Sequence, residues 1–75
     1  MANELDMSEH HRRPRSLEGK TVPKNISVVS VKKHQAWHLL FRNHPPNIIA
    51  EIINKVWLDP DFEMVVVRRK KKVRR

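Results

Sequence analysis

The hydrophobic pattern first becomes regular at residues 25–31, where the sequence NISVVSV alternates apolar and polar side chains. A period of two, together with β-branched residues, predicts a short β-strand. The chain before it is polar. Residues 1–8 are expected to be flexible, residues 9–16 contain Pro14 and are excluded as a helix interior, and residues 17–24 are expected to be a loop.

Helical character begins directly after this strand. Ser30 is a suitable N-cap for a helix over residues 31–42 (VKKHQAWHLLFR), and Trp37 and Phe41 are expected to lie in its core-facing side. We expect this helix to end near Asn43, because the two prolines that follow disfavour helical backbone in the residues before them.

A second helix is predicted from Pro46 or Asn47 to about Trp57. Its apolar residues recur as adjacent pairs every four positions, which predicts one broad buried face that includes Trp57. This face over residues 47–57 is alternatively a surface for a protein partner or for a second copy of the chain. An Asp-Pro-Asp turn follows, and residues 62–67 (FEMVVV) are predicted to form a C-terminal strand.

The size and composition of the chain limit how it can be stabilised. It has 75 residues and no cysteine. Domains of this size bury a small core and often rely on a disulfide, a metal or a partner. Without cysteine, only a metal bound by histidine and carboxylate remains as an internal cross-link. No apolar stretch is long enough to cross a membrane, and no signal peptide is recognisable, so we expect a cytoplasmic protein.

The net charge of +8 lies mostly at the C-terminus. Residues 1–67 contain nine basic and eight acidic residues, whereas residues 68–75 contain seven basic residues and no acidic one. Such a tail predicts salt-dependent binding to nucleic acid, while a solubility tail and a contact with a ribosome or membrane surface are the alternatives. The residues assigned to nucleic-acid contact are Arg68, Arg69, Lys70, Lys71 and Lys72.

Four of the five histidines fall in two pairs. His34 and His38 are four positions apart, so on a helix their rings project from one face and can bind one metal ion. His10 and His11 are adjacent, and on an extended segment they face opposite ways. One can therefore bind the metal while the other faces the substrate. A neutral imidazole is suited to general-base work near neutral pH.

The order of residues between Glu9 and Phe41 resembles the ββα-metal finger of the H-N-H endonuclease family, with the histidine spacing of its colicin-type DNases. The resemblance covers about 33 of the 75 residues. The matching positions are His10, His11, Pro14, Ser16, Gly19, Asn25, His34 and His38.

This resemblance implies metal-dependent hydrolysis of a nucleic-acid phosphodiester bond, with DNA as the expected substrate. It implies His10, His34 and His38 as ligands of one divalent ion, for which nitrogen ligands favour Zn, Ni, Co or Mn over Mg in affinity. It also implies His11 as the general base and Asn25 as the residue that bridges the loop and holds the His11 ring by a hydrogen bond. Three neighbouring arginines are expected to contact phosphates: Arg12, Arg13 and Arg15.

The expected fold is a small α+β domain, in which a β-hairpin and a helix surround the metal and a second helix and a C-terminal strand follow. The corresponding segments are a flexible N-terminus (residues 1–8), the H-N-H-like motif (9–42), a helix-turn-strand extension (43–67) and the basic tail (68–75).

The loop departs from the family pattern at Glu18. The family often has two consecutive glycines there, and here only Gly19 remains to take a positive φ angle. Glu18 also puts a negative charge near the expected phosphate position. The alternative function is therefore a non-catalytic nucleic-acid- or protein-binding module, such as a phage-encoded regulator derived from an H-N-H fold. His11 distinguishes the two, because only the enzyme requires it.

Overall fold

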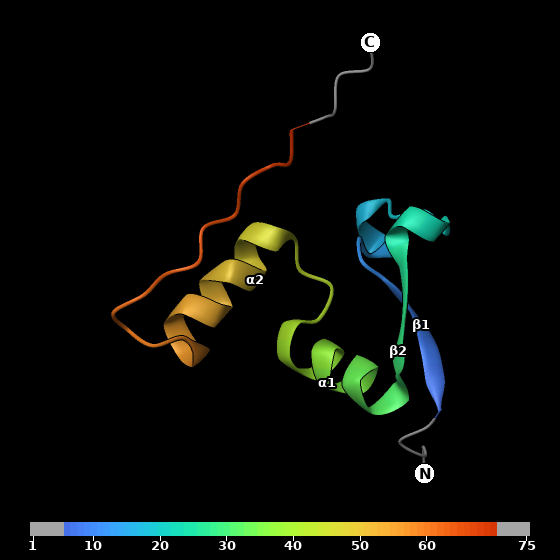
Figure 1. Cartoon of the computed structure of the whole chain (residues 1–75), viewed down its shortest axis with the longest axis horizontal. Helices are drawn as coiled ribbons and strands as arrows, with labels where there is room; N and C mark the ends of the chain where they lie inside the picture. Colours follow the sequence, from blue (N-terminus) through green and yellow to red (C-terminus); the bar gives the residue numbers. More distant parts are fainter. Residues whose placement is uncertain (1–5, 71–75) are drawn as a thin grey trace. The chain divides into compact units, whose positions relative to one another are not determined.

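The computed structural model describes residues 6–70, and the chain divides into two units, Met1–Pro45 and Pro46–Arg75. A two-stranded antiparallel sheet and two α-helices give a mixed α+β architecture, which confirms the predicted class (Figure 1). Within the described part, no helix has both the length and the hydropathy needed to span a membrane.

The first unit is built on one antiparallel strand pair. β1 (Met7–His11) pairs with β2 (Ile26–Ser30), so that Met7 lies opposite Ser30 and His11 opposite Ile26. The predicted strand is therefore confirmed to within one residue at each end. The expectation of a flexible N-terminus was wrong for Met7 and Ser8, because pairing with β2 supplies partners for backbone groups in a segment whose side chains are mostly polar.

Helix α1 (Val31–Phe41) follows β2 without an intervening loop. Ser30 caps it as predicted, since its Oγ accepts a hydrogen bond from the backbone N–H of Lys33 at 3.1 Å. Trp37 and Phe41 lie side by side, with ring centroids 4.7 Å apart, but both remain partly exposed. The predicted helix is confirmed, whereas its aromatic residues cover only a thin core.

The second unit contains helix α2 (Pro46–Ile52), which continues into the π-helical turn η3 (Ile53–Trp57). The predicted extent of this helix is confirmed. The prediction of one broad buried face was wrong at its C-terminal end, where Trp57 is 60% exposed, and the isoleucines of this face are only partly buried. The wider π turn rotates the last residues away from the direction that a regular α-helical period predicts.

The predicted C-terminal strand is absent from the described part of the chain, where residues 62–67 have no strand partner. A strand requires a neighbouring strand for its backbone groups, and β propensity alone cannot supply one. At Met64, the side chain of Asn54 supplies the backbone hydrogen bonds that a neighbouring strand would otherwise supply. Its Oδ1 accepts the Met64 N–H at 2.8 Å, and its Nδ2 donates to the Met64 carbonyl oxygen at 2.9 Å.

Candidate metal centre and active site

Three histidines of the first unit converge between β1 and α1. His10 comes from β1, and His34 and His38 come from successive turns of α1, which contacts both strands. One ring nitrogen from each lies within 4.8 Å of the other two. The three residues that the resemblance implied as ligands are therefore close enough to hold one metal ion.

The ring of His10 has the properties of a metal ligand. Its Nδ1 is buried and has no hydrogen-bond partner within residues 6–70. Burial, followed by the proximity of His34 and His38, lowers its pKa below the ordinary value of 6.5. A ring held neutral with an unpaired buried nitrogen is suited to a metal, because ligation requires the neutral form and satisfies that atom.

The two helical histidines already face each other. Their Nε2 atoms are 2.9 Å apart, so one ring donates a hydrogen bond to the other. Two nitrogens bound tetrahedrally to one zinc ion lie roughly 3.3 Å apart, given Zn–N distances of about 2.0–2.1 Å. If the two Nε2 atoms moved apart by only a few tenths of an ångström, they would therefore reach the spacing of two ligands of one zinc ion.

Ser8 orients His34 from the neighbouring strand. Its Oγ lies 2.5 Å from His34 Nδ1. When Nδ1–H donates to Ser8, the lone pair of His34 is on Nε2, which faces His38. Burial and then the proximity of His38 lower the pKa of His34, which favours the neutral ring. Ser8 was missed, although it precedes His10 by two positions and therefore shares its strand face.

His11 borders a small cavity that two histidines of the three-histidine cluster also line. The cavity has a volume of about 240 Å³, and both His34 and His38 also line it. The remaining lining residues are Pro14, Arg15, Ser16 and Asn43. The predicted base and two of the three predicted ligands therefore border one space. Asn43 was missed, because it was read only as the end of the helix.

The ring of His11 is held by Thr21, not by Asn25. His11 Nε2 lies 2.9 Å from Thr21 Oγ1. The Asn25 amide instead bonds to backbone: Oδ1 accepts from the Arg13 N–H, and Nδ2 donates to the Arg13 and Lys20 carbonyl oxygens, at 2.7, 3.1 and 2.9 Å. The expected hydrogen bond from Asn25 to the His11 ring is thus wrong, whereas the expected bridging of the loop by Asn25 is confirmed. The Asn25 amide bonds to backbone on both sides of the β1–β2 connection, so it is directed at the loop and not at that ring.

The three arginines near the site take different positions. Arg15 lines the cavity beside His11. Arg13 is tied to the loop, since its Nε donates to the Leu17 carbonyl oxygen at 2.7 Å, and Arg12 is exposed without lining the cavity. Among them, only Arg15 is therefore brought to the space that His11 borders.

In the loop between β1 and β2, the residue with a positive φ angle is not the one expected. Glu18, with φ 67° and ψ 24°, takes the left-handed conformation expected of Gly19, whose φ is not positive. Gly19 is needed for another reason. A Cβ there would fall on the carbonyl oxygen of Arg13, while the Gly19 N–H donates to the Pro14 carbonyl oxygen at 2.9 Å. Close backbone approach, and not φ, requires glycine at this position.

The basic tail begins in the second unit. Arg68, Arg69 and Lys70 are exposed, which leaves their charges available to a polyanion. Lys71 and Lys72, which were assigned to the same contact, lie outside the described residues.

Comparison with known proteins gives no match to a family model, to a curated protein or to a solved structure. A function for the chain is therefore argued from the chemistry of the site and from the sequence resemblance, and not from a matched relative.

Proposed function

We propose that the chain is a metal-dependent nuclease of the H-N-H type, which hydrolyses phosphodiester bonds of nucleic acid, with DNA as the expected substrate. One observation carries the proposal: His11 borders the same 240 Å³ cavity as His34 and His38. A general base and a metal would therefore face one small space, which is the arrangement that hydrolysis of a phosphodiester needs.

His10, His34 and His38 form the proposed ligand set. Their nitrogens lie within 4.8 Å of one another, and three nitrogen ligands leave coordination positions for water or substrate. Zn, Ni, Co and Mn suit such ligands better than Mg, although any of the five can be tested for turnover. When bound, the ion supplies Lewis-acid stabilisation of the charge that develops on the phosphate.

His11 is the proposed base and Thr21 its positioning residue. If Nε2–H donates to Thr21 Oγ1, the lone pair lies on Nδ1 and can accept a proton from water. Arg15 is placed to bind phosphate oxygens, because it lines the same cavity and a guanidinium binds such oxygens in a bidentate manner. Asn25 keeps the loop that carries Arg15 closed against the end of β1.

A binding protein with a purely structural metal is the second candidate. The exposed residues Arg68, Arg69 and Lys70 favour it, because they offer nucleic-acid contacts that need no catalysis. In that protein the metal would tie β1 to α1, and His11 would be dispensable.

The decisive experiment uses the purified full chain, stripped of metal, with each of the five ions added back. Cleavage of plasmid DNA, cleavage of RNA and zinc binding by calorimetry are measured on wild type, His11→Ala, His34→Ala/His38→Ala and the control His44→Ala. His44 lies outside the cluster. We expect His11→Ala to bind zinc normally but to cleave about 10²–10⁴-fold more slowly. The ligand double variant should lose both properties, and His44→Ala neither.

Two results would contradict the proposal. Absence of cleavage of DNA and RNA by wild type with every ion would exclude the nuclease and leave the binding protein. Unchanged zinc affinity in His34→Ala/His38→Ala would exclude the ligand set.

A further inference from the structure

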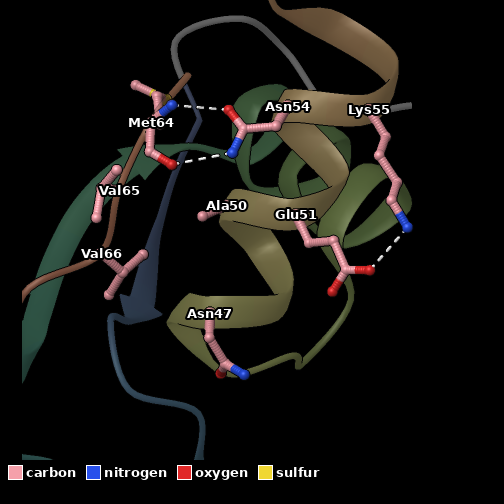
Figure 2. A pocket seen from close by; sticks show the side chains of 8 residues that line it. All are labelled: Asn47, Ala50, Glu51, Asn54, Lys55, Met64, Val65 and Val66. Carbon is pink, nitrogen blue, oxygen red and sulfur yellow. Dashed lines mark hydrogen bonds and ion pairs between the residues drawn. The ribbon is translucent and has the colours of Figure 1, made fainter.

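Residues 63–67 are hydrogen-bonded along one backbone edge at Met64 alone, and their other backbone edge is open. Asn54 bonds to both backbone groups of Met64 (Figure 2). In an extended chain these two groups point to the same side, and those of the adjacent residues point to the opposite side. Glu63 and Val65 therefore direct their N–H and C=O groups away from Asn54. Within residues 6–70, these groups have no hydrogen-bond partner.

The side chains along this edge are apolar and exposed. Val65 is 71% exposed and Val67 is 79% exposed, in a stretch that Figure 1 draws as an extended trace after the turn that follows η3. An extended apolar segment with an open edge readily accepts another strand by backbone hydrogen bonding.

The charges that flank the segment indicate which strand fits. Three acidic residues precede or begin it: Asp59, Asp61 and Glu63. Three basic residues follow it within the described chain: Arg68, Arg69 and Lys70. Two such segments side by side in parallel would place like charges together. An antiparallel arrangement places the acidic end of each beside the basic end of the other, so the segment is complementary to itself.

We propose that residues 63–69 pair antiparallel with the same residues of a second copy of the chain. This segment belongs to the second unit and the proposed metal centre to the first, and the pairing does not depend on the proposed function. Because the odd-numbered residues direct their backbone groups to the edge opposite Asn54, hydrogen-bonded pairs on that edge join odd to odd. Pairing Glu63 with Arg69 meets this condition and sets Val65 opposite Val67. Val66 then lies on the two-fold axis, opposite Val66 of the second copy.

A neighbouring register fits less well. A shift by two residues would set Val65 opposite itself and Glu63 opposite Val67, which leaves both glutamates of the dimer without an opposite charge. Arg69 would then face Asp61, which lies in the turn and not in the extended segment. The register with Glu63 and Arg69 paired compensates both, and the apolar residues still meet one another across the strands.

Charge reversal tests the partner and the register together. The association of the full chain is measured by sedimentation equilibrium over a concentration series at low salt. We expect wild type to dimerise and Glu63→Arg to weaken the dimer about tenfold or more, as two lost ion pairs replaced by repulsion would do. Glu63→Arg/Arg69→Glu should restore the affinity. The control Glu63→Arg/Arg68→Glu has the same net charge and should not, because residue 68 lies opposite Met64 on the other face.

Cross-linking provides a test that does not rely on affinity. The chain has no cysteine, so Val66→Cys introduces a single thiol. Residues opposite each other in a non-hydrogen-bonded antiparallel pair have Cα atoms about 4.5 Å apart, which is within the range of a disulfide. Mild oxidation should therefore join two copies of Val66→Cys. Val65→Cys and Val67→Cys should cross-link far less, because neither residue lies opposite itself.

Each contrary outcome overturns the proposal. A wild-type chain that stays monomeric throughout the series excludes a second copy as the occupant of this edge. A dimer that survives Glu63→Arg uses another surface, such as the exposed Val56 and Trp57. Equal cross-linking at positions 65, 66 and 67 would exclude the register.

Discussion

At the scale of single residues, the left-handed conformation that a glycine would adopt most easily is taken by Glu18 and not by the neighbouring Gly19. The glutamate takes the left-handed backbone, and the glycine makes room for the Arg13 carbonyl oxygen. A left-handed conformation costs a residue with a side chain about 1–2 kcal/mol, whereas glycine adopts it freely. Glu18 is therefore a position of backbone strain beside the loop that lines the candidate site.

Replacing Glu18 with glycine should stabilise the chain. The relieved strain exceeds the additional entropy that glycine loses on folding, so we expect Glu18→Gly to raise the free energy of unfolding by about 0.5–1 kcal/mol. Gly19→Ala should lower it by about 2 kcal/mol or more, because the added methyl group collides with backbone. Urea denaturation measures both. Glu18→Ala removes the charge but keeps the strain, and a Glu18→Gly protein no more stable than Glu18→Ala would contradict this explanation.

Thr21 should affect turnover and not metal binding. If its hydroxyl fixes the tautomer of His11, Thr21→Val should lower kcat of nucleic-acid cleavage by about 10–100-fold while KM and zinc affinity stay near wild type. Thr21→Ser keeps the hydroxyl and should restore most of the activity. A Thr21→Ser enzyme as slow as Thr21→Val would show that the methyl group, and not the hydrogen bond, matters.

At the scale of elements, the connection between β1 and β2 depends on one amide. Asn25 was identified from its place in the motif, but its contacts depend on a loop that returns to Arg13 and Lys20. Helix α1 was easier to predict, because its start at Ser30 and its end before the prolines depend on residues within one turn. Residues 62–67 were predicted wrongly, because β propensity is a local property and could not reveal that no strand lies beside them in the described chain.

Removal of the Asn25 amide should loosen this connection. Asn25→Ala loses three hydrogen bonds to backbone, each worth about 0.5–1.5 kcal/mol net, so we expect a loss of about 2–3 kcal/mol in the free energy of unfolding. Asn47→Ala is the matched control, because within residues 6–70 the Asn47 side chain makes no hydrogen bond, and it should change stability by less than about 0.5 kcal/mol. Equal effects of the two substitutions would show that the loop does not depend on the amide.

At the scale of the whole molecule, each of the two units covers little apolar surface. No side chain within residues 6–70 is fully buried, so few contacts oppose the conformational entropy of the unfolded chain. A metal that joins His10 of β1 to the two histidines of α1 would add a cross-link where the core is thin. In the second unit, a partner strand on the open edge of residues 63–67 would act in a similar way.

Stability should fall as the pH is lowered through the histidine range. The pKa values of His10 and His34 are lowered from 6.5 in the folded chain. Below about pH 6.5 the unfolded chain therefore binds protons that the folded chain does not, which favours unfolding, and above that pH the contribution is constant. Zinc at 100 times its dissociation constant should add about 2.7 kcal/mol near neutral pH. Acid should remove this gain, because protons displace the metal.

Thermal unfolding between pH 5 and pH 8, with and without zinc, measures this dependence. His34→Ala/His38→Ala should lose the zinc-dependent stabilisation and keep the rest of the profile with a smaller slope. A wild-type chain whose zinc-dependent gain is the same at both ends of this range would contradict the assignment of histidines as ligands.

The sequence by itself determined the features that depend on neighbouring residues: β2, the cap and extent of α1, the start of α2, and the common helix face of His34 and His38. The resemblance named His10 as the third ligand, and the tertiary structure brings it to that pair. Only the tertiary structure decided that Thr21 and not Asn25 holds the His11 ring, that Glu18 takes the left-handed conformation, and that residues 62–67 lack a strand partner within the described chain. Periodicity and capping are set by contacts within a few residues. Ligand convergence and strand pairing depend on which distant segments the loops bring together, and no local pattern specifies that.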